Sequence, residues 1–186
     1  MTQSERRRYL IRRLADDGQE AVAVPREEQA QKRLLCALFN VRPPAPCDVE
    51  FLRVQDAYLQ EETQQKGVTD LATLTPIRPD IYLWQGDMTA LKYDAIVNAA
   101  NSALLGCFCP NHGCVDNAIH TFAGVQLRLA CAELMEKQGH DEPTGQAKIT
   151  PSFNLPCRYV IHTVGPVVCR RLTERDCALL ESCYRS

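Results

Sequence analysis

Apolar residues follow two different periods along the chain, and the change between them falls near residue 80. Upstream of that point, apolar positions recur at helical spacing in three otherwise polar stretches, and the proline-rich turn 42–46 separates the last two. We expect the second helix to begin at Pro25 and the third to follow Asp48 as its N-cap. Residues 1–79 are therefore predicted to form a helical N-terminal extension.

Downstream of residue 80, short apolar runs without helical period alternate with amphipathic stretches. The runs that predict strands are 80–84, 94–100 and 158–164. The stretch 115–138 predicts one helix of about six turns that stops at Gly139, and a capping-box variant at 173–176 opens a last helix. This alternation predicts an α/β sandwich with a partly parallel sheet. Three strands make a thin sheet, so we expect the sheet to be incomplete.

Composition and charge exclude several classes of protein. The chain has 186 residues, of which 45% are hydrophobic and 24% charged, as in an average globular domain. A net charge of −2 provides no basic field for a nucleic-acid partner, and no apolar run is long enough for a membrane-spanning helix. Ten cysteines without a secretory signal predict a reducing, cytoplasmic location, where clustered cysteines favour metal ligation or chemistry over disulfides.

Three of the cysteines fall within eight residues of one another. Cys107, His112 and Cys114 offer a thiolate, an imidazole and a second thiolate from a loop that contains proline and glycine and can fold back on itself. Zinc accepts this ligand set, and three protein ligands leave the fourth tetrahedral position for water or substrate. Cys109 is an alternative fourth ligand that would make the site structural. Unmetallated reactive thiols or a transient disulfide are further alternatives.

Polar residues also follow the ends of the first two predicted strands. Asp87 comes after the first, and Asn98 and Asn101 lie at the end of the second. Ligands of α/β sheets bind at the carboxyl ends of strands, although each residue alone is better explained as a turn residue or a helix cap. His120 and His162 lie among apolar residues and are expected to be core histidines.

In combination, five segments have the order and spacing of a macrodomain, the ADP-ribose-binding fold. They are Gly-Asp-Met-Thr at 86–89, Asp-Ala-Ile-Val-Asn-Ala-Ala-Asn at 94–101, Val-Asp-Asn-Ala-Ile-His at 115–120, Gly-Gln-Ala-Lys-Ile-Thr at 145–150 and Val-Ile-His-Thr-Val-Gly-Pro at 160–166. The cysteine-containing loop resembles that of a zinc-containing macrodomain class, known from microbial proteins linked with sirtuin-type ADP-ribosyltransferases and lipoate-carrying proteins. The stretch before residue 80 resembles the N-terminal extension of that class.

The resemblance implies a macrodomain-like α/β/α sandwich with a mixed sheet over 80–186, lacking its C-terminal part. It also implies removal of mono-ADP-ribose from acidic side chains of modified proteins, among which a lipoate-carrying protein is a candidate, with Cys107, His112 and Cys114 as zinc ligands. Nothing in 167–186 matches the second phosphate-binding loop of macrodomains. We therefore expect weaker ADP-ribose affinity and a partly uncovered sheet edge.

Further roles carried over from the resemblance concern ADP-ribose itself. Asp87 would receive the adenine amino group, and the Met88 backbone would face the ring. Asn98 and Asn101 would contact the ligand, with Asn101 holding the distal ribose beside the metal, and Asp116 would orient water or a ligand.

Three other functions stay open at this point. A binding module could read ADP-ribose without hydrolysing it, although it would not need an open zinc position. A structural zinc protein would use Cys109 as the fourth ligand. Thiol redox chemistry would persist in metal-free protein.

Overall fold

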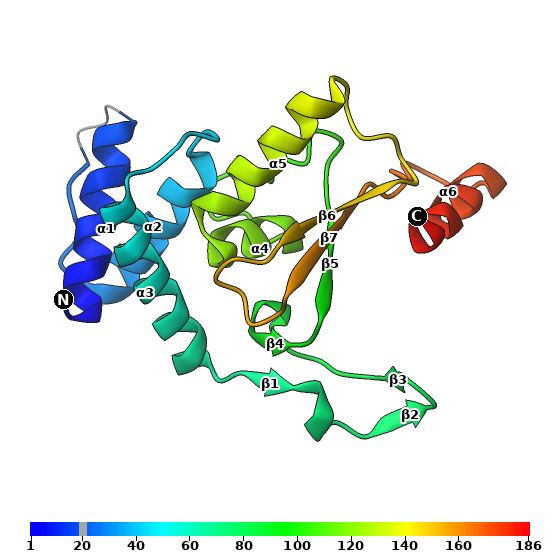
Figure 1. Ribbon diagram of the computed structural model, residues 1–186, viewed down its shortest axis with the longest axis horizontal. Helices are drawn as coiled ribbons and strands as arrows, with labels where there is room; N and C mark the ends of the chain where they lie inside the picture. Colours follow the sequence, from blue (N-terminus) through cyan, green and yellow to red (C-terminus); the bar gives the residue numbers. More distant parts are fainter. Residues whose placement is uncertain (19–21) are drawn as a thin grey trace.

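The computed structural model describes residues 1–18 and 22–186 (Figure 1). Helices α1–α3 form one end of the molecule, the main sheet with α4 and α5 lies in the middle, and α6 lies at the other end. The helices are α1 (Gln3–Asp17), α2 (Glu28–Val41), α3 (Val49–Lys66), α4 (Val115–Ala123), α5 (Val125–Gln138) and α6 (Glu174–Arg185), with the 3-10 turns η1 (Leu71–Thr73) and η2 (Met88–Ala90).

The three N-terminal helices pack around a hydrophobic core of their own. Its buried residues are Leu10, Ile11, Leu14, Leu35, Leu38, Phe39, Phe51, Val54, Tyr58 and Leu59. Asp48 caps α3 by accepting a 2.8 Å hydrogen bond from the Phe51 amide, as predicted. The predicted start at Pro25 is wrong by three residues, because α2 begins at Glu28 and the Pro25 carbonyl instead accepts from the Gln31 side chain.

Between α3 and the main sheet, the chain forms two small pairs of strands. β1 (Thr69–Asp70) runs parallel to β4 (Leu91–Lys92), and β2 (Pro76–Arg78) forms an exposed hairpin with β3 (Ile81–Tyr82). The strand predicted at 80–84 is therefore reduced to two residues and lies outside the main sheet. The boundary proposed near residue 80 stays a prediction.

The main sheet has three strands in the order β5–β7–β6, and it is mixed, as expected for this α/β fold. β5 (Ala95–Ala99) runs parallel to β7 (Tyr159–Thr163), which confirms two predicted strands, and β6 (Ala147–Pro151) runs antiparallel to β7. In the β5–β7 register, Asn98 is the partner of His162. This pairing places two polar side chains together inside the molecule.

The helical stretch 115–138 is two helices rather than the single one predicted. Gly124 has φ +93° and ψ 176°, which ends α4 and begins α5 at the same residue. A side chain there would have its Cβ 2.6 Å from Nε2 of Gln55, whose Oε1 accepts a 3.0 Å hydrogen bond from the Val125 amide. The close approach of the N-terminal helices thus requires glycine at the break.

A second hydrophobic core joins α4 and α5 to the main sheet. Its buried residues are Ile96, Leu104, Ile119, Ala123, Leu127, Cys131, Leu155, Cys157, Val160 and Val164. At the far end, Thr173 and Asp176 form the predicted capping box of α6. Within the part of the chain that the structure describes, every helix falls short of the length and apolarity needed to cross a membrane.

Candidate active site and metal centre

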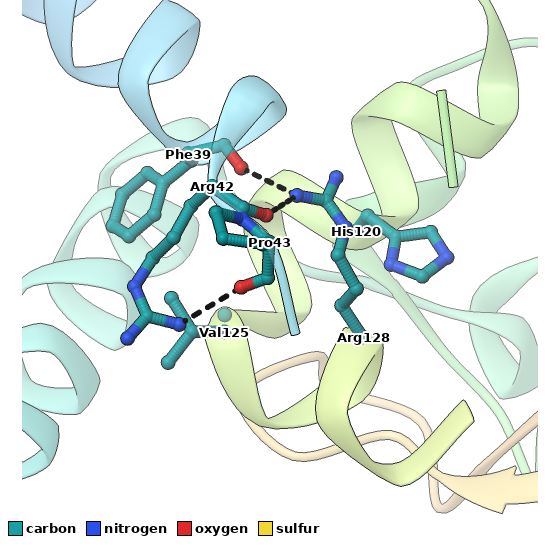
Figure 2. A pocket seen from close by; sticks show the side chains of 7 residues that line it. Phe39, Arg42, Pro43, His120, Val125 and Arg128 are labelled. Atoms are coloured by element: carbon teal, nitrogen blue, oxygen red, sulfur yellow. Dashed lines mark hydrogen bonds between the residues drawn. The ribbon is translucent and has the colours of Figure 1, made fainter. Parts of the chain in front are cut away.

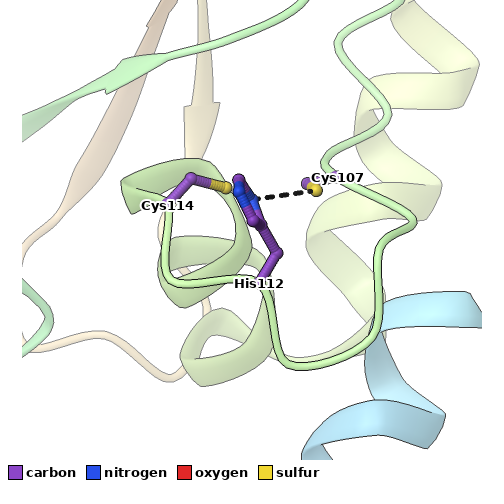
Figure 3. Close-up of side chains that lie close together, drawn as sticks. All are labelled: Cys107, His112 and Cys114. Carbon is purple, nitrogen blue, oxygen red and sulfur yellow. Dashed lines mark hydrogen bonds between the residues drawn. The ribbon is translucent and has the colours of Figure 1, made fainter.

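The side chains of Cys107, His112 and Cys114 converge in the loop between β5 and α4 (Figure 3). Their ligand atoms all lie within 4.8 Å of one another, and Cys107 Sγ lies 3.6 Å from His112 Nδ1. Two ligands at zinc–sulfur and zinc–nitrogen bond lengths, with a tetrahedral angle between them, would be about 3.6 Å apart. Both the donor set and this spacing fit zinc. His112 is exposed and the cysteines are half-buried, so the centre faces solvent.

The loop reaches this shape through local turns and the start of α4. Asn111 adopts a left-handed conformation with φ +54°, and the His112 amide donates to the Cys109 carbonyl at 3.2 Å. Cys114 is the N-cap of α4, and its Sγ accepts from the Asn117 amide at 3.4 Å. Burial raises the pKa of the Cys114 thiol. The exposed Cys109 does not belong to the group of converging ligand atoms.

Asp116 lies directly after the last of these three residues and is almost fully buried. Its Oδ1 accepts a 2.7 Å hydrogen bond from Nδ2 of Asn98, which is itself 3.2 Å from Nδ1 of His162. Burial raises the pKa of Asp116, and the hydrogen bond from Asn98 opposes this shift. Asn98 is fully buried, and its side chain supports the Asp116 carboxylate. Its predicted contact with a ligand stays a prediction.

Behind Asp116 lies a second convergence of side chains, formed by the buried His120, Cys131 and His162. Burial lowers the pKa of His120 to about 3 and that of His162 to about 4, and it raises the pKa of Cys131 to about 12. All three are therefore neutral at pH 7. Nε2 of His162 lies 2.9 Å from the Thr150 hydroxyl. The two histidines are core residues, as predicted.

Asn101 and Asp87 both lie on the surface, Asn101 two residues after the end of β5 and Asp87 at the start of η2, beside the end of α3. Asn101 donates from Nδ2 to the Gly106 carbonyl at 2.9 Å, which fixes the residue directly before the metal-ligand loop, residues 107–114. Asp87 caps η2 by accepting from the Thr89 amide at 2.9 Å, and its other oxygen accepts from Lys66 Nζ at 2.9 Å. Burial alone would raise the pKa of Asp87, but hydrogen bonds from Thr89 and Lys66 lower it. The adjacent Met88 packs against the second core.

Comparison with known proteins shows to which family the chain belongs. The family model described as Macro domain matches residues 97–186. A protein-ADP-ribose hydrolase of Treponema medium is 57% identical over 192 aligned residues, covering 100% of this chain and 74% of the relative. Another, from Staphylococcus aureus strain MRSA252, is 50% identical and covers 96% of this chain and 68% of the relative. The chain belongs to the macrodomain family.

Solved structures agree with this assignment. The Trypanosoma brucei macrodomain has a TM-score of 0.55 and 29% identity, and the match covers 88% of this chain and 66% of that one. The same macrodomain in complex with ADP-ribose has a TM-score of 0.54 and 30% identity, over 80% of this chain and 64% of that one. This macrodomain thus spans about two thirds of the solved chains it matches. Because its curated relatives carry the name of hydrolases, the expectation of an enzyme is confirmed at the level of the family.

Sequence reasoning missed three buried polar residues that hold the site of this macrodomain together, namely Asn40, Asn117 and Arg128. Arg128 is 5% exposed, and burial lowers its pKa to about 10, so it keeps its charge at pH 7. Its guanidinium donates to the carbonyls of Leu105 at 2.8 Å, Phe39 at 3.0 Å and Arg42 (Figure 2). The signal in the sequence is a charged residue between the apolar residues Leu127 and Leu129 of a predicted helix.

The cavity in Figure 2 lies where Arg128 meets the end of α2. Its volume is about 10 Å³, at the lower limit for one water molecule. His120 also lines it, and neither ring nitrogen of His120 has a hydrogen-bond partner among residues 1–18 and 22–186. The cavity is too small for a ligand, so the candidate site of this macrodomain remains the surface around the converging cysteines and histidine.

Proposed function

We propose that this macrodomain is a zinc-dependent hydrolase that removes mono-ADP-ribose from acidic side chains of modified proteins. The observation that carries the proposal is the solvent-facing group of Cys107, His112 and Cys114 beside the buried carboxylate of Asp116. The relatives named protein-ADP-ribose hydrolase support the hydrolytic part of the proposal. Zinc dependence and the acidic linkage rest on the ligand set and on the family resemblance.

In this proposal, the three ligand residues hold the metal and leave one coordination position open. When bound, zinc supplies a Lewis acid that fixes a ribose oxygen or water and lowers the pKa of a bound hydroxyl. The remaining steps belong to the side chains of the protein.

The reaction breaks the bond between the anomeric carbon of the ribose and the carboxylate oxygen of the modified side chain. This bond breaks with oxocarbenium character, as in glycoside hydrolysis, and water adds to the anomeric carbon. Asp116 orients that water and accepts the proton that it loses, and the side chain leaves as its carboxylate. Asn101 holds the distal ribose at the mouth of the loop, and Asp87 receives the adenine amino group.

The test is release of ADP-ribose from a protein mono-ADP-ribosylated on aspartate or glutamate, with and without a zinc chelator. Release that the chelator stops and that Cys114→Ser abolishes is the expected result. Cys109→Ser is the matched control, since Cys109 lies in the same loop but outside the converging group. A lipoate-carrying protein is the first substrate to try, and its role and the cytoplasmic location stay predictions.

Two other outcomes would redirect the proposal. Zinc bound at one equivalent without any release would favour a module that binds ADP-ribose without hydrolysing it. Release that persists after the metal has been removed would favour a metal-independent hydrolase.

A further inference from the structure

We propose that Asn40, at the C-terminal end of α2, is a positioning residue for the metal-ligand loop, defined as residues 107–114. The N-terminal helices are then part of the metal centre. This inference rests on the proposed function, because it concerns how the same three ligands are held. It predicts that a substitution in α2, far away in sequence, changes the zinc affinity.

Asn40 is 1% exposed. Its side chain forms three hydrogen bonds of about 3 Å, one with the loop and two with α4, which follows the loop. Oδ1 accepts from the Asn111 amide at 2.9 Å and from Nδ2 of Asn117 at 3.1 Å. Nδ2 donates to the Thr121 hydroxyl at 2.9 Å. A buried amide is costly unless it is hydrogen-bonded, and here its partners lie 71 to 81 residues away in the chain.

The bond to Asn111 acts on the one residue of 107–114 with a left-handed backbone. Asn111 has φ +54°, a conformation that few residues other than glycine, asparagine and aspartate adopt. It lies directly before the ligand His112. A fixed acceptor for its amide holds the turn that carries His112 toward the two cysteines.

The bond to Asn117 connects Asn40 to two further backbone groups of the loop, the carbonyls of Cys109 and His112. Nδ2 of Asn117 donates to the carbonyl of Cys109 at 3.2 Å and to that of His112 at 3.0 Å, besides its bond to Asn40. The amide nitrogen of Asn117 donates to Sγ of Cys114. Asn40 and Asn117 thus form one buried pair that contacts the loop on both sides of Asn111, and Asn117 also contacts Cys114 Sγ, one of the two ligand sulfur atoms.

Arg128 stabilises the same junction. Its guanidinium donates to the carbonyls of Phe39 and Arg42, which flank Asn40 in the chain (Figure 2). The guanidinium carbon also lies 4.4 Å from the ring centroid of Phe108 in the loop. These bonds hold the end of α2 against α5. They thereby also fix the position of Asn40, whose Oδ1 accepts the hydrogen bond from the loop.

These contacts affect the zinc affinity because an exposed loop can adopt many conformations, whereas zinc binding requires the one in which the three ligands converge. Ordering the loop costs conformational entropy, which must be offset either by the metal or by the protein. Groups that orient the ligands of a metal typically change its affinity by about 10- to 100-fold when they are removed. We expect an effect of about tenfold from Asn40, because it acts through the backbone of the loop and not on a ligand atom.

The experiment compares the zinc affinities of the full chain and its Asn40→Ala variant by competition with a chromophoric chelator. Gln55→Ala is the matched control. Gln55 is also a fully buried amide from the N-terminal helices, and its Oε1 accepts from the Val125 amide of α5, away from the metal-ligand loop. Both variants should lose thermal stability, but Asn40→Ala alone should bind zinc about tenfold more weakly. Asn40→Asp, whose carboxylate can accept the bonds from both Asn111 and Asn117, should recover most of the affinity.

A second readout needs no metal. Amide hydrogen exchange over 107–114 in zinc-free protein should be faster in Asn40→Ala than in Gln55→Ala, since the Asn111 amide loses its acceptor. If Asn40→Ala does not fold, Asn40→Ser fills part of the space, is too short to reach the loop, and should show the same loss.

The outcomes separate the two proposals. Zinc affinity and loop exchange that are equal in the Asn40 and Gln55 variants would overturn the positioning role while leaving the proposed function intact. A wild-type chain that binds no zinc would overturn the proposed metal centre itself, and the role of Asn40 with it.

Discussion

Asn98 on β5 donates a 2.7 Å hydrogen bond to Asp116 on the first turn of α4, and this bond fixes the carboxylate that follows the metal-ligand loop by two residues. Asn98 is held in turn by His162, its register partner on β7. The orientation of the Asp116 side chain therefore depends on the main sheet.

Asp116→Asn should lower kcat for ADP-ribose release by about 100-fold or more, because the side chain keeps its shape but can no longer accept a proton or orient water as a carboxylate. Zinc content and thermal stability should change little. Asn98→Ala should lower kcat less, since the carboxylate remains but loses its orienting donor. Steady-state kinetics with a zinc assay check both, and full activity in Asp116→Asn would remove Asp116 from the mechanism.

Asp87→Ala should weaken ADP-ribose binding about tenfold, since hydrogen bonds to a charged group contribute roughly 1.5–3 kcal/mol. Asp70→Ala is the matched control, because Asp70 caps η1 and pairs with Lys92 as Asp87 caps η2 and pairs with Lys66. Calorimetric titration with ADP-ribose measures both. Equal losses would mean that Asp87 acts only as a helix cap.

Gly106→Ala should destabilise the protein by about 1–3 kcal/mol, the usual cost of a strained backbone conformation. Gly106 has φ +80°, and a Cβ there would lie 2.8 Å from the ring of His120. Gly113→Ala, in the same loop, meets no atom within 4 Å and has no positive φ, so it should be close to neutral. Urea denaturation of the two variants tests this, and similar losses would contradict it.

Acid should destabilise the fold through its buried histidines. Burial lowers the pKa of His162 to about 4, so between that value and the ordinary value of 6.5 the unfolded chain binds a proton that the folded chain does not. The free energy of unfolding should therefore fall as the pH falls from 6.5 towards 4, by up to about 1.4 kcal/mol per pH unit for this residue. Above pH 6.5 both states are neutral and the effect vanishes.

His162→Gln should reduce this slope, whatever its effect on stability at pH 7. The exposed His140→Gln serves as control and should leave the slope unchanged. Urea denaturation at several pH values between 4 and 7 measures it. A slope that is the same in wild type and His162→Gln would show that other groups cause the acid sensitivity.

The sequence predicted those elements that have a local signal. β5 and β7 were found as short apolar runs, and Asp48 and Thr173 as caps of ordinary chemistry, but the polar residues Asn98 and His162 are also fully buried in these strands. β6 was missed because its pattern is inverted. Ile149 is 57% exposed, whereas Thr150 is 2% exposed and faces His162.

Other features depend on contacts between distant parts of the chain, which periodicity does not report. The break at Gly124 follows from the approach of Gln55, and the single helix that was predicted ignores this contact. Cys107, His112 and Cys114 could be grouped because they are close in sequence, and the structure brings them together. The role of Asn40 could not be read from the sequence, because its partners only come near it in the folded protein.

The separation of Asn40 from its partners also has a consequence for synthesis. Asn111 follows Asn40 by 71 residues, and chains grow at about 5–20 residues per second, so several seconds pass between the two. The helices α1–α3 have a hydrophobic core of their own and can assemble within that interval. The metal-ligand loop would then leave the ribosome opposite a surface that already presents its acceptor, and it could close as it is made.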